Sequence, residues 1–252
     1  MPEPASSGEE IVAAVASVVT PRTRVLFVSH ITSLSAIVLP VARLCADARR
    51  LGILSIVDGA HAPGQIPLDV DATGADVYVG NLHKWVCSPR GTAFVHARAE
   101  IRARIRAPVV SWGWSWDGPA AFQSRYRWQG TFDPTALLAV PAAIAFRREH
   151  AWETVIESCR ERLERLVSEL ESRLRGVPAA APELRAPQLA AVHLDLGGRE
   201  PAEVQRLLWE RHQIEVPVER IGGLTVVRVS VQGYVSDDDC CALVDALASL
   251  PS

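Results

Sequence analysis

The chain has 252 residues, of which 48% are hydrophobic and 22% are charged, with a net charge of −3. This composition supports a sizeable core and excludes a disordered chain, and without a basic stripe it gives no electrostatic basis for binding nucleic acid. Five cysteines without framework spacing argue against structural disulfides and fit a reducing compartment. Because no apolar run approaches the about 18 residues of a membrane span, and residues 1–10 lack the basic start of a signal peptide, we expect a cytoplasmic protein that does not contact the membrane.

Helices and strands are expected to alternate in the first part of the chain. The expected elements are a helix over Gly8–Val19, a strand over Val25–Val28, a helix over Leu39–Leu51, strands over Ile53–Val57, Ala75–Val79 and Thr92–Val95, and a helix over Pro134–Phe146. The first strands form a βαβ unit with a right-handed crossover, and their near-continuous apolar character indicates a sheet covered on both faces. Residues 111–130 carry four tryptophans without a clear period, which fits either a loop over a core or a wall facing a substrate.

The second part opens with the clearest helical pattern. Apolar residues at three- and four-residue steps predict a long helix over Glu149–Arg175. A Pro- and Ala-rich link over residues 177–187 is followed by a strand over Ala190–Leu196, a helix over Pro201–His212, strands over Ile214–Val218 and Thr225–Val231, and a helix over Ser236–Ala248. We therefore expect a large domain over residues 1–148 and a smaller α+β domain over residues 149–252.

Two short runs, VDGAH at residues 57–61 and GNLHKW at residues 80–85, each follow an apolar strand. Ligands of open parallel α/β sheets bind at the carboxyl ends of the strands. An acid (Asp58) and a lysine (Lys84) at that edge suit pyridoxal 5'-phosphate (PLP), because the amine forms a Schiff base with the aldehyde and the carboxylate keeps the pyridine nitrogen protonated. Either residue alone is more often a loop or turn residue, but the pair, with a histidine beside each, favours the functional interpretation.

Further runs extend this pattern into a family resemblance. The runs SHITS at residues 29–33, VDGAHAPG at 57–64, GNLHKW at 80–85, WQGTFDPT at 128–135 and RVS at 228–230 resemble the class V aminotransferase family, nearest to its isopenicillin N epimerase-like branch. The resemblance covers the chain from about Val25 onward. It implies an α/β fold of the PLP-dependent transferase type (fold type I), with a mostly parallel sheet, flanking helices and a smaller α+β C-terminal domain.

The resemblance also implies roles for residues around the ring of the cofactor. Lys84 matches the Schiff-base lysine, and Asp58 matches the partner of the pyridine nitrogen. His61 would lie near the phenolic oxygen of the ring, and Ser33 could donate a hydrogen bond to that oxygen.

The remaining matches concern the phosphate and the substrate. His83 and Asn81 resemble phosphate ligands, and Thr131 resembles a threonine that reaches the phosphate of the neighbouring subunit, which implies a homodimer with shared sites. Arg228 matches the arginine that binds the α-carboxylate of the substrate, for which a bidentate guanidinium is suited. Without the family, an arginine on an apolar strand could equally be an edge residue pointing to solvent.

These residues predict a PLP-dependent enzyme acting at the Cα of an amino acid or a peptide-like amine, as an epimerase, an aminotransferase or a lyase. Residues 212–223 lack the cysteine that a desulfurase needs. The sequence has no dinucleotide fingerprint, P-loop or nucleophile elbow, and its histidines lack metal-ligand spacing, so we expect no metal site.

Members of the family carry a further stretch before the segment that matches Val25, with a loop that cradles the phosphate and a residue that stacks on the ring. Residues 1–24 do not resemble it. The sequence is therefore either a fragment or mis-started reading of a longer enzyme, or a shortened relative. We expect weak PLP binding and an exposed apolar sheet face that favours dimers or aggregates. The alternative function is that of a truncated non-catalytic homologue serving as a dimerisation or interaction module.

Overall fold

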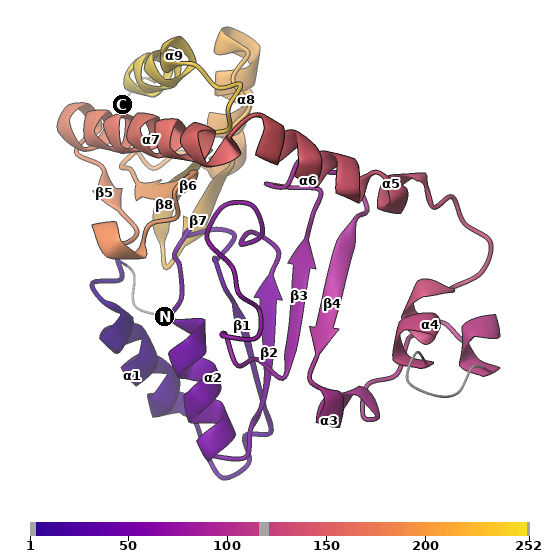
Figure 1. Ribbon diagram of the computed structural model, residues 1–252. Coiled ribbons are helices and arrows are strands. Elements are labelled where there is room, and N and C mark those ends of the chain that lie inside the picture. The colour runs from indigo at the N-terminus through magenta and orange to yellow at the C-terminus, as the bar shows by residue number, and fades with distance from the viewer. Residues whose placement is uncertain (1–3, 116–120, 251–252) are drawn as a thin grey trace.

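The computed structural model describes residues 4–115 and 121–250 and contains two four-stranded sheets (Figure 1). The elements in chain order are α1 (Gly8–Val18), β1 (Val25–Ser29), α2 (Val41–Arg50), β2 (Leu54–Gly59), β3 (Val77–Asn81), β4 (Ala93–Ala97), α3 (Ala99–Arg102), η1 (Trp112–Ser115), α4 (Ala121–Arg127), α5 (Thr135–Leu138), α6 (Val140–Glu149), α7 (Trp152–Leu174), β5 (Val177–Pro178), η2 (Pro182–Leu184), β6 (Leu189–His193), α8 (Pro201–His212), β7 (Val218–Ile221), β8 (Leu224–Ser230) and α9 (Asp237–Ala248). None of the described helices is long and apolar enough to cross a membrane.

The first sheet has the strand order β1-β2-β3-β4, in which β1, β2 and β3 are parallel and β4 is antiparallel to β3. Helices α1 and α2 lie against one face of this sheet (Figure 1). Helix α1 begins after Ser7, whose hydroxyl accepts a hydrogen bond from the Glu10 backbone N–H at 3.2 Å, as expected of an N-cap. Ile11, Val57 and Tyr78 are fully buried between these helices and the sheet.

The other face of the first sheet is partly bare, so the prediction of a sheet covered on both faces is wrong for β1. The strand register aligns Phe27 with Ile56 and Val77, which places their side chains on one face. Ile101 of α3 and Phe122 of α4 pack near Val77, but Phe27 remains 66% exposed. An apolar pattern shows that a strand is able to be buried on both faces, but not that helices cover both. Here the described helices cover only the β3 and β4 side of this face.

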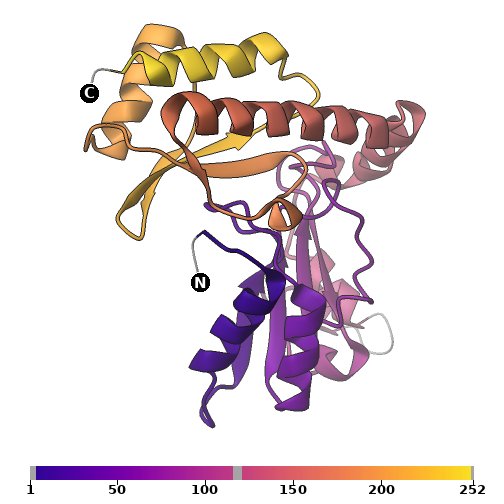
Figure 2. The ribbon, with the colours of Figure 1, turned by 90° about the vertical axis from the view of Figure 1, so that its left-hand side faces the viewer.

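The second sheet has the order β5-β6-β8-β7 and is antiparallel throughout. Helices α7 and α9 lie side by side on it, with α8 at one end (Figure 2). The predicted strand Ile214–Val218 is wrong in position, because the ladder runs from Val218 to Ile221 and pairs with β8 across Gly222 and Gly223. Both glycines have positive φ, which a two-residue hairpin turn favours, and this turn sets the register.

The segment between the sheets also departs from the predicted pattern. The long helix begins at Trp152 rather than at Glu149, because Ala151 adopts a left-handed conformation (φ 44°) that separates α6 from α7. Residues 111–130 contain two short helices, η1 and α4, rather than only a loop. Of the four tryptophans there, Trp116 lies outside the described residues. The domain boundary between residues 148 and 149 stays a prediction.

A chain of buried glutamines joins the first sheet to the second. Gln65, Gln188 and Gln232, here called the glutamine chain, are 1%, 0% and 8% exposed. The Gln188 backbone N–H donates to Oε1 of Gln65 at 3.1 Å, and Nε2 of Gln188 donates to Oε1 of Gln232 at 3.0 Å. Since Gln65 also donates to the His61 carbonyl at 2.8 Å, the network runs from the second sheet to a loop that follows β2.

Candidate active site

The carboxyl ends of β2 and β3 carry the acid and the lysine that the sequence singles out. Asp58 lies near the end of β2, where one carboxylate oxygen accepts the Ala60 backbone N–H at 2.9 Å and shapes the turn toward His61. Lys84 lies in the loop after β3. Because β2 and β3 are parallel neighbours, the two loops leave the sheet at the same edge.

Lys84 and His61 meet directly at this edge. The Lys84 Nζ lies 3.0 Å from Nε2 of His61, and the indole Nε1 of the buried Trp85 donates to Nδ1 of His61 at 3.3 Å. Lys84 is also the only lysine in the chain, because every other residue counted under Lys and Arg is an arginine. The site therefore holds the one primary amine that any side chain of this protein offers.

Burial tunes both groups toward their neutral forms. It lowers the pKa of His61 from 6.5 to about 4, and the positive charges of Lys84 and Arg228 act in the same direction. Burial also lowers the pKa of Lys84; nearby Asp58 opposes this shift and Arg228 adds to it. An unprotonated lysine is a nucleophile, so the site can present a reactive amine beside a neutral imidazole and a carboxylate.

The second sheet contributes Arg228, from β8, to the same place. Its Nη1 donates to the Ser33 carbonyl oxygen at 2.9 Å and lies 3.3 Å from the Ser33 hydroxyl, so these two predicted residues meet across the sheets. The buried Nε of Arg228 has no hydrogen-bond partner among the described residues, and burial lowers the pKa of the guanidinium. A buried donor without a partner is costly. A carboxylate that accepted a hydrogen bond from this Nε–H would remove that cost, so Arg228 is suited to bind one.

Two of the predicted phosphate ligands lie close to Lys84 in the chain. Asn81 is the last residue of β3. Nδ1 of His83 lies 2.9 Å from the Thr92 carbonyl oxygen; a carbonyl only accepts, so Nδ1 carries a proton.

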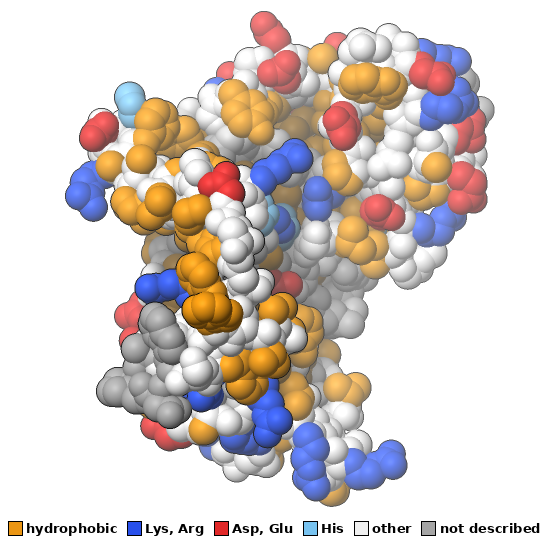
Figure 3. Space-filling view, turned by 90° about the vertical axis from the view of Figure 1, so that its right-hand side faces the viewer, with side chains coloured by type: hydrophobic (Ala, Val, Ile, Leu, Met, Phe, Trp, Pro, Cys, Tyr) orange, Lys and Arg blue, Asp and Glu red, His pale blue; other side chains and the backbone are white. Residues whose placement is uncertain are grey.

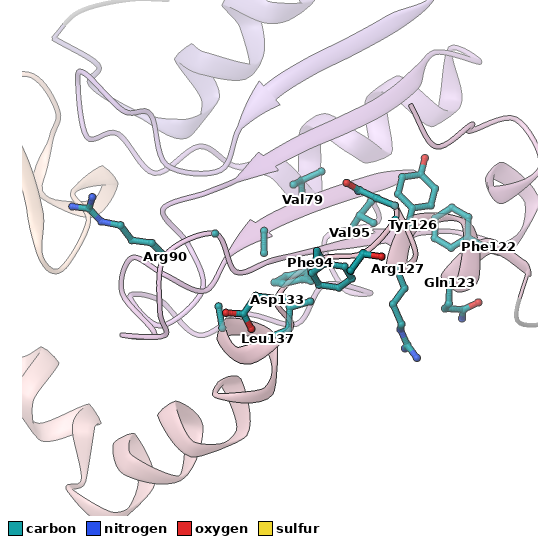
Figure 4. Close-up of a pocket in the computed structure, with 17 residues that line it drawn as sticks. Val79, Arg90, Phe94, Val95, Phe122, Gln123, Tyr126, Arg127, Asp133 and Leu137 are labelled. Atoms are coloured by element: carbon teal, nitrogen blue, oxygen red, sulfur yellow. The ribbon is translucent and has the colours of Figure 1, made fainter. Parts of the chain in front are cut away.

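Thr131 lies elsewhere. It lines a cavity of about 870 Å³ beside β4, together with Val79, Phe94 and Tyr126 (Figure 4). No hydrogen bond joins Thr131 to Lys84 within the described part of the chain. Figure 3 shows hydrophobic side chains gathered on the side of the molecule that carries α4 and α5.

Arg147 of α6 is a site residue that the sequence did not predict. One guanidinium nitrogen donates to the Trp85 carbonyl oxygen at 2.6 Å and the other to the Gly64 carbonyl oxygen at 2.9 Å, so one side chain ties together the loops that carry Lys84 and His61. These loops touch at Gly64 (φ 82°), where a Cβ would lie 2.8 Å from the Trp85 backbone. The glycine in the run at residues 57–64 was a local signal for this approach; the arginine, far away in sequence, gave none.

Comparisons with known proteins agree with this architecture. Residues 2–240 match the family described as Aminotransferase class-V. The chain is 37% identical to isopenicillin N epimerase of Amycolatopsis lactamdurans over 98% of its length, and 34% identical to isopenicillin N epimerase of Streptomyces clavuligerus over 99%. It spans 65% and 66% of the length of these relatives.

Solved structures show the same fold at lower identity. One is the complex between the cystine C-S lyase C-DES and its reaction product cysteine persulfide, with a TM-score of 0.78 and 22% identity over 96% of this chain and 65% of the other. Another is the apo cysteine desulfurase of Thermococcus onnurineus NA1, with a TM-score of 0.75 and 18% identity over 90% of this chain and 60% of the other. The predicted α/β fold of type I is confirmed.

Proposed function

Because the chain belongs to the class V aminotransferase family, we propose that it uses PLP, the cofactor of this family, to act at the Cα of an amino acid or a peptide-like amine. The reaction would be an epimerisation, a transamination or a lyase reaction. When bound, the cofactor withdraws electrons from the substrate Cα. An amino-acid-like substrate fits the family and the two isopenicillin N epimerase relatives.

One observation carries the proposal. The only lysine of the chain lies at the carboxyl ends of β2 and β3, half-buried, 3.0 Å from an imidazole that burial keeps neutral. Lys84 would be the covalent attachment point of the cofactor. Asp58, on the neighbouring strand, would hold a proton at the pyridine nitrogen by its negative charge.

Other residues of the chain would bind and orient. His61 and Ser33 would lie at the phenolic oxygen, and Arg228 would bind the substrate carboxylate with its free donors. His83 and Asn81 would hold the phosphate, with Thr131 of a second copy completing the site in a homodimer. The five cysteines are free, which fits the cytoplasm as the proposed location.

The test is reductive trapping. The protein is incubated with PLP, reduced with borohydride, digested and mapped by mass spectrometry. We expect the pyridoxyl group on Lys84 and its loss in Lys84→Arg. The amino terminus, the only other primary amine, is the internal control. Label on the amino terminus alone would contradict the proposal.

A second candidate function, that of a non-catalytic dimerisation or interaction module, is favoured by the exposed apolar face of β1. Phe27 is 66% and Val25 is 47% exposed there, and contiguous apolar surface marks sites of protein association. This function predicts a colourless protein that stays colourless with added PLP and still associates with itself. A yellow protein with label on Lys84 would exclude it.

A further inference from the structure

Trp85, next to Lys84 in the chain, points its indole N–H at His61. The indole Nε1–H can donate but cannot accept, and it lies 3.3 Å from Nδ1 of His61. Trp85 is 7% exposed and packs in a cluster with Ile31 and Ala62. A buried indole N–H needs an acceptor, so Nδ1 of His61 is that acceptor and carries no proton.

The second nitrogen of the same imidazole then follows by elimination. A neutral histidine has one N–H, so with Nδ1 accepting, the proton sits on Nε2. That nitrogen lies 3.0 Å from the Lys84 Nζ. An Nε2–H can donate only to an amine that keeps its lone pair, whereas an ammonium would bring N–H against N–H.

We propose that Trp85 is a positioning residue that fixes His61 in the Nε2–H tautomer and thereby favours the unprotonated amine of Lys84. The inference deepens the proposed function and takes its functional meaning from the role of Lys84 there. The unprotonated amine carries the lone pair that a bond to a carbonyl carbon requires.

The charges around Lys84 show why such a device matters. The Asp58 carboxylate, from β2, favours the ammonium form, and the Arg228 guanidinium, from β8, disfavours it. Burial, the largest cause, also disfavours the ammonium form, and the hydrogen-bond partner of the amine acts on this balance directly. A phenylalanine at position 85 would fill much of the same space without an N–H. His61 could then turn to the Nδ1–H tautomer, whose Nε2 accepts a hydrogen bond from the ammonium form of Lys84.

The first experiment uses the unmodified chain without cofactor. Long-range ¹H–¹⁵N NMR of protein labelled at histidine reports which ring nitrogen carries the proton, and the spectrum of His61→Gln assigns the signal. We expect at neutral pH a protonated Nε2 and an unprotonated Nδ1. A protonated Nδ1, or a signal averaged between the two tautomers, would overturn the inference whether or not any variant folds.

The second experiment measures the consequence at Lys84. Because the chain has one lysine, protein labelled with ¹³C-lysine gives a single side-chain signal whose titration is the pKa of Lys84. In Trp85→Phe this pKa should rise by about one pH unit, as expected when a donor to the neutral amine is lost. Trp209→Phe, a matched loss of an indole that is 53% exposed on α8, should leave it unchanged. An unchanged pKa in a folded Trp85→Phe protein would refute the inference.

These outcomes separate the inference from the proposed function. If borohydride places no cofactor on Lys84 but His61 holds the Nε2–H tautomer and Trp85→Phe raises the Lys84 pKa, the proposed function falls and the inference about Trp85 stands. If Lys84 is labelled and the tautomer is the other one, only the inference falls.

Discussion

The two sheets of the protein differ in how completely they are covered. Every residue of β6, in the second sheet, is buried, and α7, α8 and α9 enclose a continuous apolar core around it. In the first sheet, β1 leaves Val25 and Phe27 exposed, yet this sheet carries Asp58 and Lys84. The comparison teaches that the acid and the lysine of the site belong to the half whose first strand leaves apolar side chains exposed, and not to the half with a strand buried along its whole length.

The most direct way to break the comparison is to remove one apolar side chain from each half. Leu170 of α7 is fully buried in the second core, so Leu170→Ala should lower the free energy of unfolding by about 3–4 kcal/mol. Phe27→Ala should lower it by no more than about 0.5 kcal/mol, because Phe27 is already exposed. Urea unfolding of both variants measures the difference, and similar losses would show that the first sheet is better covered than its exposure indicates.

A change of charge at the first sheet should affect turnover more than stability. Asp58→Asn keeps the size of the side chain but removes the carboxylate proposed to hold the pyridine nitrogen protonated. We expect turnover to fall about 10²-fold, which corresponds to about 3 kcal/mol of activation free energy, with some cofactor binding retained. Steady-state kinetics on the holoenzyme measures this; a turnover within about twofold of the parent would remove Asp58 from the proposed role.

Arg228 is the residue of the second sheet that we place at the substrate, so its contribution should be to binding. Arg228→Ala should weaken the binding of substrates that have a free α-carboxylate by about 2 kcal/mol, because a charge-assisted contact is lost. The affinity for PLP should be nearly unchanged. Comparing amino acids with the corresponding amines that lack the carboxylate isolates the effect. Equal losses for both kinds of substrate would argue against carboxylate recognition.

Acid should act on the first sheet through His30. Burial lowers the pKa of this histidine from 6.5 to about 4, and its Nδ1 lies 2.9 Å from the Tyr78 hydroxyl. The folded state keeps His30 neutral while the unfolded state binds a proton below pH 6.5, so stability is lost as the pH falls from 6.5 to about 4. When the pH is lowered from 7 to 5, we expect the free energy of unfolding of His30→Asn to fall by about 1–2 kcal/mol less than that of the parent. Urea titrations at the two pH values measure this, and an equal loss of stability in the parent and in His30→Asn would contradict the prediction.

The smallest expected change in stability tests what the bare face does. Phe27→Lys places a charge on that face and should alter the free energy of unfolding by less than about 0.5 kcal/mol. It should nevertheless reduce self-association, measured by light scattering across a concentration series. Tyr234→Lys, at an aromatic residue that is 85% exposed outside the first sheet, is the matched control. If both variants associated as strongly as the parent, the β1 face would not be the surface through which the protein self-associates.

Local patterns in the sequence predicted the elements better than the contacts between them. Helix α8 matches its predicted range Pro201–His212, because Pro201 at the start and the apolar spacing are local signals. The strand expected at Ile214–Val218 was misplaced because the turn at Gly222 and Gly223 sets the pairing. That turn was visible in the sequence as two adjacent glycines between apolar runs.

The site divides in the same way. The placement of Asp58 and Lys84 at neighbouring strand ends followed from runs of a few residues. The contacts that hold them did not, because Arg147 reaches the loop carbonyls from 62 and 83 residues away in the chain. Only the fold brings such residues together. The count of a single lysine, in contrast, was available in the sequence from the start.

The glutamine chain determines how this protein can open. A hinge rotation that separated the sheets would leave the buried amides of Gln65 and Gln188 without partners, at about 1–3 kcal/mol for each. The same rotation would pull on the His61 carbonyl, to which Gln65 donates. We therefore expect a substrate to reach Lys84 through movements of side chains and short loops at the rim, while the two sheets keep their positions relative to each other.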